Sequence, residues 1–156
     1  MLKILYEKWE KNREALKSAI SRIPDVSELE YKDLVKLTFS AIYNDGDDTD
    51  IPYGYKSLGL DHITMIDNGD YQGTLLFLIP FKTYQPSESE YLMTYVGYGS
   101  CSGCDTLLSI VDYQYGPATE RQVSDLLALC KDIVTNTIKP YNSGWRYEGL
   151  FDTVEF

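Results

Sequence analysis

Apolar residues recur every three or four positions along residues 2–23, which is the spacing of one face of an α-helix. Pro24 interrupts this pattern and predicts the end of the helix. Ser27 and Glu30 have the spacing of a capping box, so a second helix is predicted to begin there. Segment 2–44 is therefore predicted to form a helical hairpin.

The middle of the chain has the patterns of an antiparallel sheet. Residues 62–67 alternate apolar and polar side chains and lead into Asn68-Gly69, a dipeptide that favours a tight hairpin turn with positive φ. Residues 71–81 contain an unbroken apolar run, which predicts a central strand covered on both faces. A third strand is predicted over residues 91–98.

The C-terminal region is predicted to be mainly helical. Residues 106–111 fit a short helix or one more strand, with the helix favoured, and residues 120–138 have the spacing of a long helix. A chain of 156 residues suits one domain. We therefore predict a single α+β domain: the helical hairpin, a central antiparallel sheet of three or more strands at 60–98, and C-terminal helices at 105–140 packed on the sheet.

The charge of the chain and its lack of targeting segments restrict the expected partners and the expected cellular compartment. Twenty-four acidic and 14 basic residues give a formal net charge of −10, which repels a phosphate backbone and disfavours direct nucleic-acid binding. The chain lacks the apolar core of a signal peptide and an apolar run long enough for a membrane span. Three cysteines cannot all pair within one monomer. We expect a cytoplasmic protein with reduced thiols and no membrane partner.

A CxxC motif is the most specific local feature. Cys101 and Cys104 lie between a predicted strand and a predicted helix, the setting in which a helix N-terminus lowers a thiol pKa for redox chemistry. Asp105 adds negative charge, however, and no βαβ unit precedes the motif. The favoured interpretation is a tight turn shaped by Gly99 and Gly103, with the small cysteines packed beneath it.

A zinc site is a second interpretation of the cysteines. Cys101, Cys104, Cys130 and His62 would complete a Cys₃His set if the fold brought them together. Cys130 lies on the apolar face of its predicted helix, where a buried structural cysteine is the more common outcome. His62 is the only histidine and has no catalytic motif around it. We therefore expect no cofactor and assign no catalytic residue, with zinc kept as the alternative.

An acidic loop follows the predicted helical hairpin. It contains Asp45, Asp47, Asp48 and Asp50, but the glycine and glutamate positions of a calcium-binding EF-hand loop do not match. Ten acidic and two basic residues lie in segment 45–105. Such a surface can imitate the phosphates of DNA on a basic partner, although acidic surfaces more often serve solubility.

Tyrosines are unusually frequent, with fourteen in the chain. Tyr91, Tyr95 and Tyr98 lie in or at the end of the third predicted strand. Tyrosine combines contact area with a hydrogen-bonding tip, so these residues are candidates for partner binding; capping of the sheet edges is the alternative.

Two segments carry a resemblance. The run GDYQG at residues 69–73 and the run YGSCSGCD at residues 98–105 resemble those of small uncharacterised proteins encoded by bacteriophages and prophages. This resemblance implies a phage-related protein in the cytoplasm of a host bacterium and transfers no catalytic residue.

These observations together predict a binding function. We expect a non-enzymatic phage accessory protein that binds a host or phage protein through an acidic, tyrosine-rich surface, with nucleic-acid mimicry as one form of this function. The alternative is a redox or zinc-binding protein centred on the CxxC motif.

Overall fold

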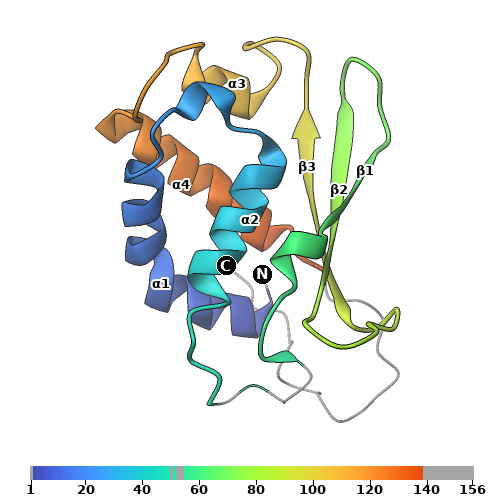
Figure 1. The fold of residues 1–156 in the computed structure, drawn as a ribbon. Helices are drawn as coiled ribbons and strands as arrows, with labels where there is room; N and C mark the ends of the chain where they lie inside the picture. Colours follow the sequence, from blue (N-terminus) through green and yellow to red (C-terminus); the bar gives the residue numbers. More distant parts are fainter. Residues whose placement is uncertain (1, 50, 52–54, 139–156) are drawn as a thin grey trace.

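The computed structural model describes residues 2–49, 51 and 55–138 and confirms the predicted α+β class. Three long helices lie on one side of a three-stranded antiparallel sheet (Figure 1). The elements, with η for 3₁₀ turns, are α1 (Lys3–Ser21), η1 (Val26–Glu28), α2 (Tyr31–Ile42), η3 (Leu60–His62), β1 (Thr64–Asp67), β2 (Gly73–Pro80), β3 (Tyr91–Tyr98), α3 (Thr106–Val111) and α4 (Glu120–Thr135).

The start of α2 differs from the capping box predicted at Ser27. The Asp25 carboxylate accepts hydrogen bonds from the Ser27 backbone N–H at 2.9 Å and from the Ser27 hydroxyl at 2.7 Å. Ser27 is thereby held in the short turn η1. The helix begins three residues later than predicted, where the Glu30 backbone N–H donates to the Asp33 carboxylate at 3.0 Å.

The sheet has the order β1-β2-β3, which confirms β2 as the central strand. Phe77 and Ile79 of β2 point toward the helices and are fully buried, whereas Leu76 and Leu78 alternate with them and are half-buried. The prediction that β2 is covered on both faces is therefore wrong for the described residues. All the helices among the described residues lie on one side of the sheet, so no described helix covers the other face (Figure 1).

The connection between β1 and β2 is longer than the tight turn predicted at Asn68-Gly69. Asp67 pairs with Leu75, and Gly69 does not have positive φ. The glycine is needed for a different reason, since a Cβ on Gly69 would lie 2.8 Å from the Gly73 Cα. The two ends of the GDYQG run therefore approach each other too closely for a side chain.

The two C-terminal helices are confirmed. The Thr119 hydroxyl accepts from the Gln122 N–H while the Gln122 side-chain oxygen accepts from the Thr119 N–H, which forms a capping box at the start of α4. The helix ends at Thr135, before the predicted 138, because Ile138 instead pairs antiparallel with Met93 on β3. The last part of the predicted 105–140 region, residues 139–140, lies outside the described residues.

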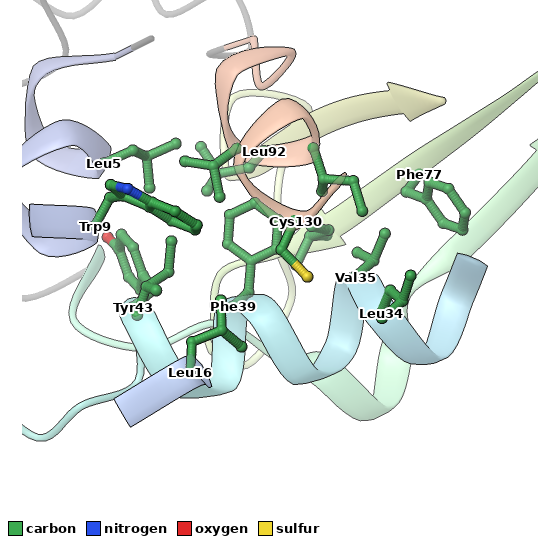
Figure 2. Close-up of a cluster of buried hydrophobic side chains, with 14 of the residues drawn as sticks. Leu5, Trp9, Leu16, Leu34, Val35, Phe39, Tyr43, Phe77, Leu92 and Cys130 are labelled. Atoms are coloured by element: carbon green, nitrogen blue, oxygen red, sulfur yellow. The ribbon is translucent and has the colours of Figure 1, made fainter. Parts of the chain in front are cut away.

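One hydrophobic core joins the helices to the inner face of the sheet (Figure 2). Trp9 of α1, Phe39 of α2 and Phe77 of β2 are all buried in it. Burying side chains of this size contributes about 1.5–3 kcal/mol each to folding. No helix among the described residues combines the length and apolar character needed to cross a bilayer.

Gly69→Ala is expected to lower the free energy of unfolding by about 1–3 kcal/mol, because the new Cβ meets backbone atoms that cannot move aside cheaply. Urea unfolding measures this change. Gly103→Ala is the matched control, since its Cβ would have no neighbour closer than the Cys101 Sγ at 3.9 Å. Similar stabilities for the two variants would contradict the close approach inferred for Gly69.

Candidate functional site

The CxxC motif forms a surface turn between β3 and α3. The Cys104 backbone N–H donates to the Cys101 carbonyl at 3.0 Å and closes the turn. Both cysteine side chains are exposed, so the prediction that they pack beneath the turn is wrong. Their Sγ atoms lie 2.6 Å apart, and the Cys101 backbone N–H donates to the Cys104 Sγ at 3.0 Å.

The buried side chain of Asp105 stabilises this turn by hydrogen bonds to the backbone on both sides of it. Its buried carboxylate accepts from the Gly99 N–H at 3.0 Å and from the Leu108 N–H at 2.9 Å, which joins the end of β3 to the first turn of α3. The Tyr31 hydroxyl donates to the same carboxylate at 3.0 Å and accepts from the Leu107 N–H at 3.1 Å. Burial, with the adjacent Asp105 charge, raises the pKa of Tyr31 to about 12. The hydroxyl therefore stays protonated and able to donate.

The turn differs in context from a thioredoxin-type site. The strands before it are all antiparallel, so the described chain supplies no βαβ unit there. The Cys101 thiol nevertheless hydrogen-bonds to Cys104 and, with backbone N–H groups of Cys101 and Ser100, lowers the pKa of the Cys104 thiol below its usual value. The local hydrogen bonds thus provide some of the thiolate stabilisation that the fold does not.

The four candidate zinc ligands are not gathered into one site. Cys130 is fully buried among apolar side chains (Figure 2), and this burial raises the pKa of its thiol to about 11. His62 is exposed in η3 rather than at the start of a strand, where the sequence had placed it. Within the described ranges, no three or more His, Cys, Asp or Glu side chains form a group able to hold a metal ion.

His62 instead borders an open groove of about 650 Å³. Lys36, Lys82 and Tyr91 also line this groove. Lys36 forms an ion pair of 2.7 Å with Asp61, beside His62. The groove therefore has mixed charge, and no nucleophile and base among its described lining residues share a hydrogen bond.

The side chain of Asp45 in the acidic loop is buried and has a structural role. Its carboxylate forms an ion pair of 2.7 Å with the Lys8 ammonium and accepts from the Asn12 amide at 2.8 Å. The Asp45 and Lys8 side chains are only 8% and 7% exposed. Burial opposes ionisation of Asp45, but the hydrogen bonds from Lys8 and Asn12 outweigh it and hold the carboxyl pKa below its usual value.

Asp47, the next aspartate of the same loop, is exposed. Lys11 pairs with Asp47, and this hydrogen bond lowers the pKa of Asp47 to about 2. Asp48 is half-buried, and Asp50 lies outside the described residues. Asp45 and Asp47 therefore carry charges that two lysines of α1 compensate. The polar Asn12 on the otherwise apolar face of the first predicted helix was the sequence signal for this contact.

The three candidate tyrosines do not share one face of the sheet. Tyr91 and Tyr95 point away from the helices, whereas Tyr98 lies on the opposite face and donates a hydrogen bond of 2.6 Å to Asp67. This hydrogen bond, with a smaller contribution from desolvation, raises the pKa of Tyr98 to about 12.

Tyr91 and Tyr95 belong to a larger surface that the sequence analysis missed. By register and strand alternation, the face of the sheet turned away from the helices, called the open sheet face below, comprises Thr64, Ile66, Thr74, Leu76, Leu78, Pro80, Tyr91, Met93, Tyr95 and Gly97. None of these residues is charged. Ile66 is 45% exposed and Tyr95 is 40% exposed. The apolar run in β2 is the sequence signal for this surface, but such a run predicts burial on both faces of the strand.

Comparison with known proteins gives no further assignment: no family model, curated protein or solved structure matches this chain.

Asp45→Ala is expected to destabilise the fold by about 3 kcal/mol at pH 7, because it leaves the buried Lys8 ammonium without its carboxylate. The folded-state pKa of Asp45 is depressed, so this contribution is present above about pH 4 and is lost as the pH falls through the folded-state value. Urea unfolding of both proteins at pH 7 and pH 3 measures the difference.

Asp70→Ala is the control for this experiment, since Asp70 is exposed in the hairpin connection and its loss should change stability by less than about 0.5 kcal/mol. A cost for Asp45→Ala that matched the Asp70 control would contradict the structural role of the ion pair.

Tyr31→Phe is expected to cost about 1–3 kcal/mol, because it leaves the buried Leu107 N–H without an acceptor and Asp105 with one donor fewer. Hydrogen exchange at the Leu107 amide should become faster. Tyr115→Phe, at a side chain 88% exposed, should leave both measurements unchanged. Unchanged Leu107 exchange in Tyr31→Phe would show that the hydroxyl does not support α3.

Proposed function

We propose that this chain is a non-enzymatic binding protein that recognises another protein through the open sheet face. The observation that carries the proposal is an uncharged, partly apolar surface in a chain of which 24% of residues are charged. Contiguous exposed apolar surface of this kind is typical of interaction sites.

The composition of the open sheet face suits protein recognition. Tyr95 and Ile66 are exposed large side chains of this face, and Leu76 lies between them on the central strand because it pairs with both. Aromatic and aliphatic side chains held on a rigid sheet lose little conformational entropy when a partner binds. The face thus has the composition of a hydrophobic interface centre.

Charge indicates the chemistry of the partner. Segment 45–105, which contains the sheet, has ten acidic and two basic residues. A partner with an apolar patch bordered by lysine or arginine would bury apolar surface against the open sheet face, and its positive charges would raise the association rate. A second copy of the chain would instead bring together two molecules of net charge −10. We therefore propose a different protein rather than self-association.

The resemblance of residues 69–73 and 98–105 to phage proteins makes a host or phage protein the expected partner. The nucleic-acid mimic version of this proposal has weaker support. Asp45 and Asp47 are paired with Lys8 and Lys11, so these carboxylates do not present free negative charge to a basic cleft.

Tyr95→Arg is expected to remove binding partners that the unmodified chain captures from bacterial lysate, because the guanidinium would have to be desolvated in the apolar contact. With the purified partner, the affinity should fall at least tenfold, which corresponds to about 1.4 kcal/mol. Calorimetry measures the affinity, and thermal unfolding checks that the variant is folded.

Tyr115→Arg is the matched control, since Tyr115 is 88% exposed between α3 and α4 and is not part of the open sheet face. The proposal requires that Tyr115→Arg bind normally. Partner binding that survives Tyr95→Arg but is lost on Asp47→Lys would place recognition in the acidic loop instead. Dimerisation that Tyr95→Arg abolishes would identify a second copy as the occupant and contradict the proposal.

A further inference from the structure

The turn at Gly99–Asp105 brings two solvent-exposed thiols together at a fixed place on the surface. The Sγ atoms of Cys101 and Cys104 are 2.6 Å apart, only slightly farther than the roughly 2.05 Å of a disulfide bond. Both side chains are exposed, so a solution reagent can reach them. No other element has to move for these sulfur atoms to meet.

The hydrogen bonds of the turn hold this geometry. The Cys104 N–H bond to the Cys101 carbonyl closes the turn, and the Asp105 carboxylate binds the Gly99 N–H on its other side. Gly99 also has no room for a side chain, since a Cβ there would lie 2.6 Å from the Cys104 Sγ. The thiols are therefore positioned before any reaction, which lowers the entropic cost of joining them.

We propose that Cys101 and Cys104 form a reversible intramolecular disulfide by exchange with the disulfide of a small thiol such as glutathione. This site is separate from the open sheet face, and partner binding there does not depend on it.

The exchange has two steps. The Cys104 thiol loses its proton, and the thiolate attacks one sulfur of the oxidised small thiol, which forms a mixed disulfide and releases one small thiolate. Cys101 then loses its proton and attacks the Cys104 sulfur, which forms the internal disulfide and releases the second small thiolate. The two released thiolates take up two protons, so the protein dithiol is oxidised by two electrons and the small disulfide is reduced to two thiols.

Cys104 is the better first nucleophile. The Cys101 backbone N–H donates to its Sγ at 3.0 Å, and the hydrogen bonds at this sulfur lower the pKa of the Cys104 thiol. Cys130 takes no part, because its thiol is fully buried in the core and its pKa is raised. The chain thus has two reactive thiols and one protected thiol.

The experiment uses the full chain, reduced and then freed of reductant. It is incubated at graded ratios of oxidised to reduced glutathione, quenched with acid, alkylated under denaturing conditions and weighed by mass spectrometry. The unmodified chain should lose two alkylation sites together over a defined range of ratios and retain one, at Cys130. Restoring reduced glutathione should return both sites.

Cys101→Ser should instead accumulate one glutathione adduct on Cys104, because the second step has lost its nucleophile. Ser102→Ala, in the same turn, should behave like the unmodified chain. Circular dichroism of each variant checks the fold, and both substitutions lie at the surface, where they disturb no core contact.

Three outcomes would overturn the proposal. The dithiol could stay reduced in a large excess of oxidised glutathione, the unmodified chain could retain stable glutathione adducts without an internal disulfide, or the cysteines could link two chains. Each outcome would show that the closeness of the two sulfur atoms does not produce an internal redox couple.

Discussion

One-sided packing of the helices on the sheet is the constraint on which the rest of the molecule depends. The helices α1, α2 and α4 bury their apolar faces in one core with the inner side chains of β2 and β3, such as Phe77 and Leu92. Burial of this apolar surface supplies the main driving force for folding. In the same arrangement no helix among the described residues lies over the other face of the sheet (Figure 1), where Ile66 and Tyr95 are exposed. The stability of the fold and the open sheet face therefore both follow from the packing of the helices on one side of the sheet.

This packing also brings basic residues of α1 next to acidic residues of the loop after α2. Helix α1 is basic within an acidic chain, and it lies where Lys8 and Lys11 reach the loop that follows α2. This loop therefore fastens α1 to α2 by an ion pair as well as by apolar contacts. A formal net charge of −10 does not mean that every acidic cluster is a free acidic surface. The carboxylates available to a partner have to be identified from their contacts, since composition counts paired and unpaired charges alike.

The sequence was sufficient for patterns that one element determines alone. The long helices and the central position of β2 follow from local spacing, because an amphipathic helix or a continuous apolar strand needs no partner to be recognised. Prediction from the sequence failed where a group outside the local pattern determines the structure. The Ser27 hydroxyl donates to Asp25 instead of capping α2, and Gly69 is needed for a close backbone approach rather than for a positive φ. The local pattern of β2 could not predict whether one or both of its faces are covered, because this depends on whether helices pack on one or both sides of the sheet. The turn that carries Cys101 and Cys104 is likewise held by Asp105, whose partners Tyr31 and Gly99 lie outside the CxxC motif.

The open sheet face and the thiol turn share β3 but lie at different places along it. Tyr91, Met93 and Tyr95 of β3 contribute to the open sheet face, and the same strand continues into the turn of Cys101 and Cys104. A change in the turn could reach the face only by moving the end of β3. The turn is already closed by the Cys104 N–H bond and held to Gly99 by Asp105 while the thiols are free. Joining two sulfur atoms already so close requires little displacement, so the end of β3 has no reason to shift. The proposed redox chemistry at this turn would thus act on whatever contacts the turn itself, while the proposed recognition by the open sheet face would depend on the uncharged side chains of that face.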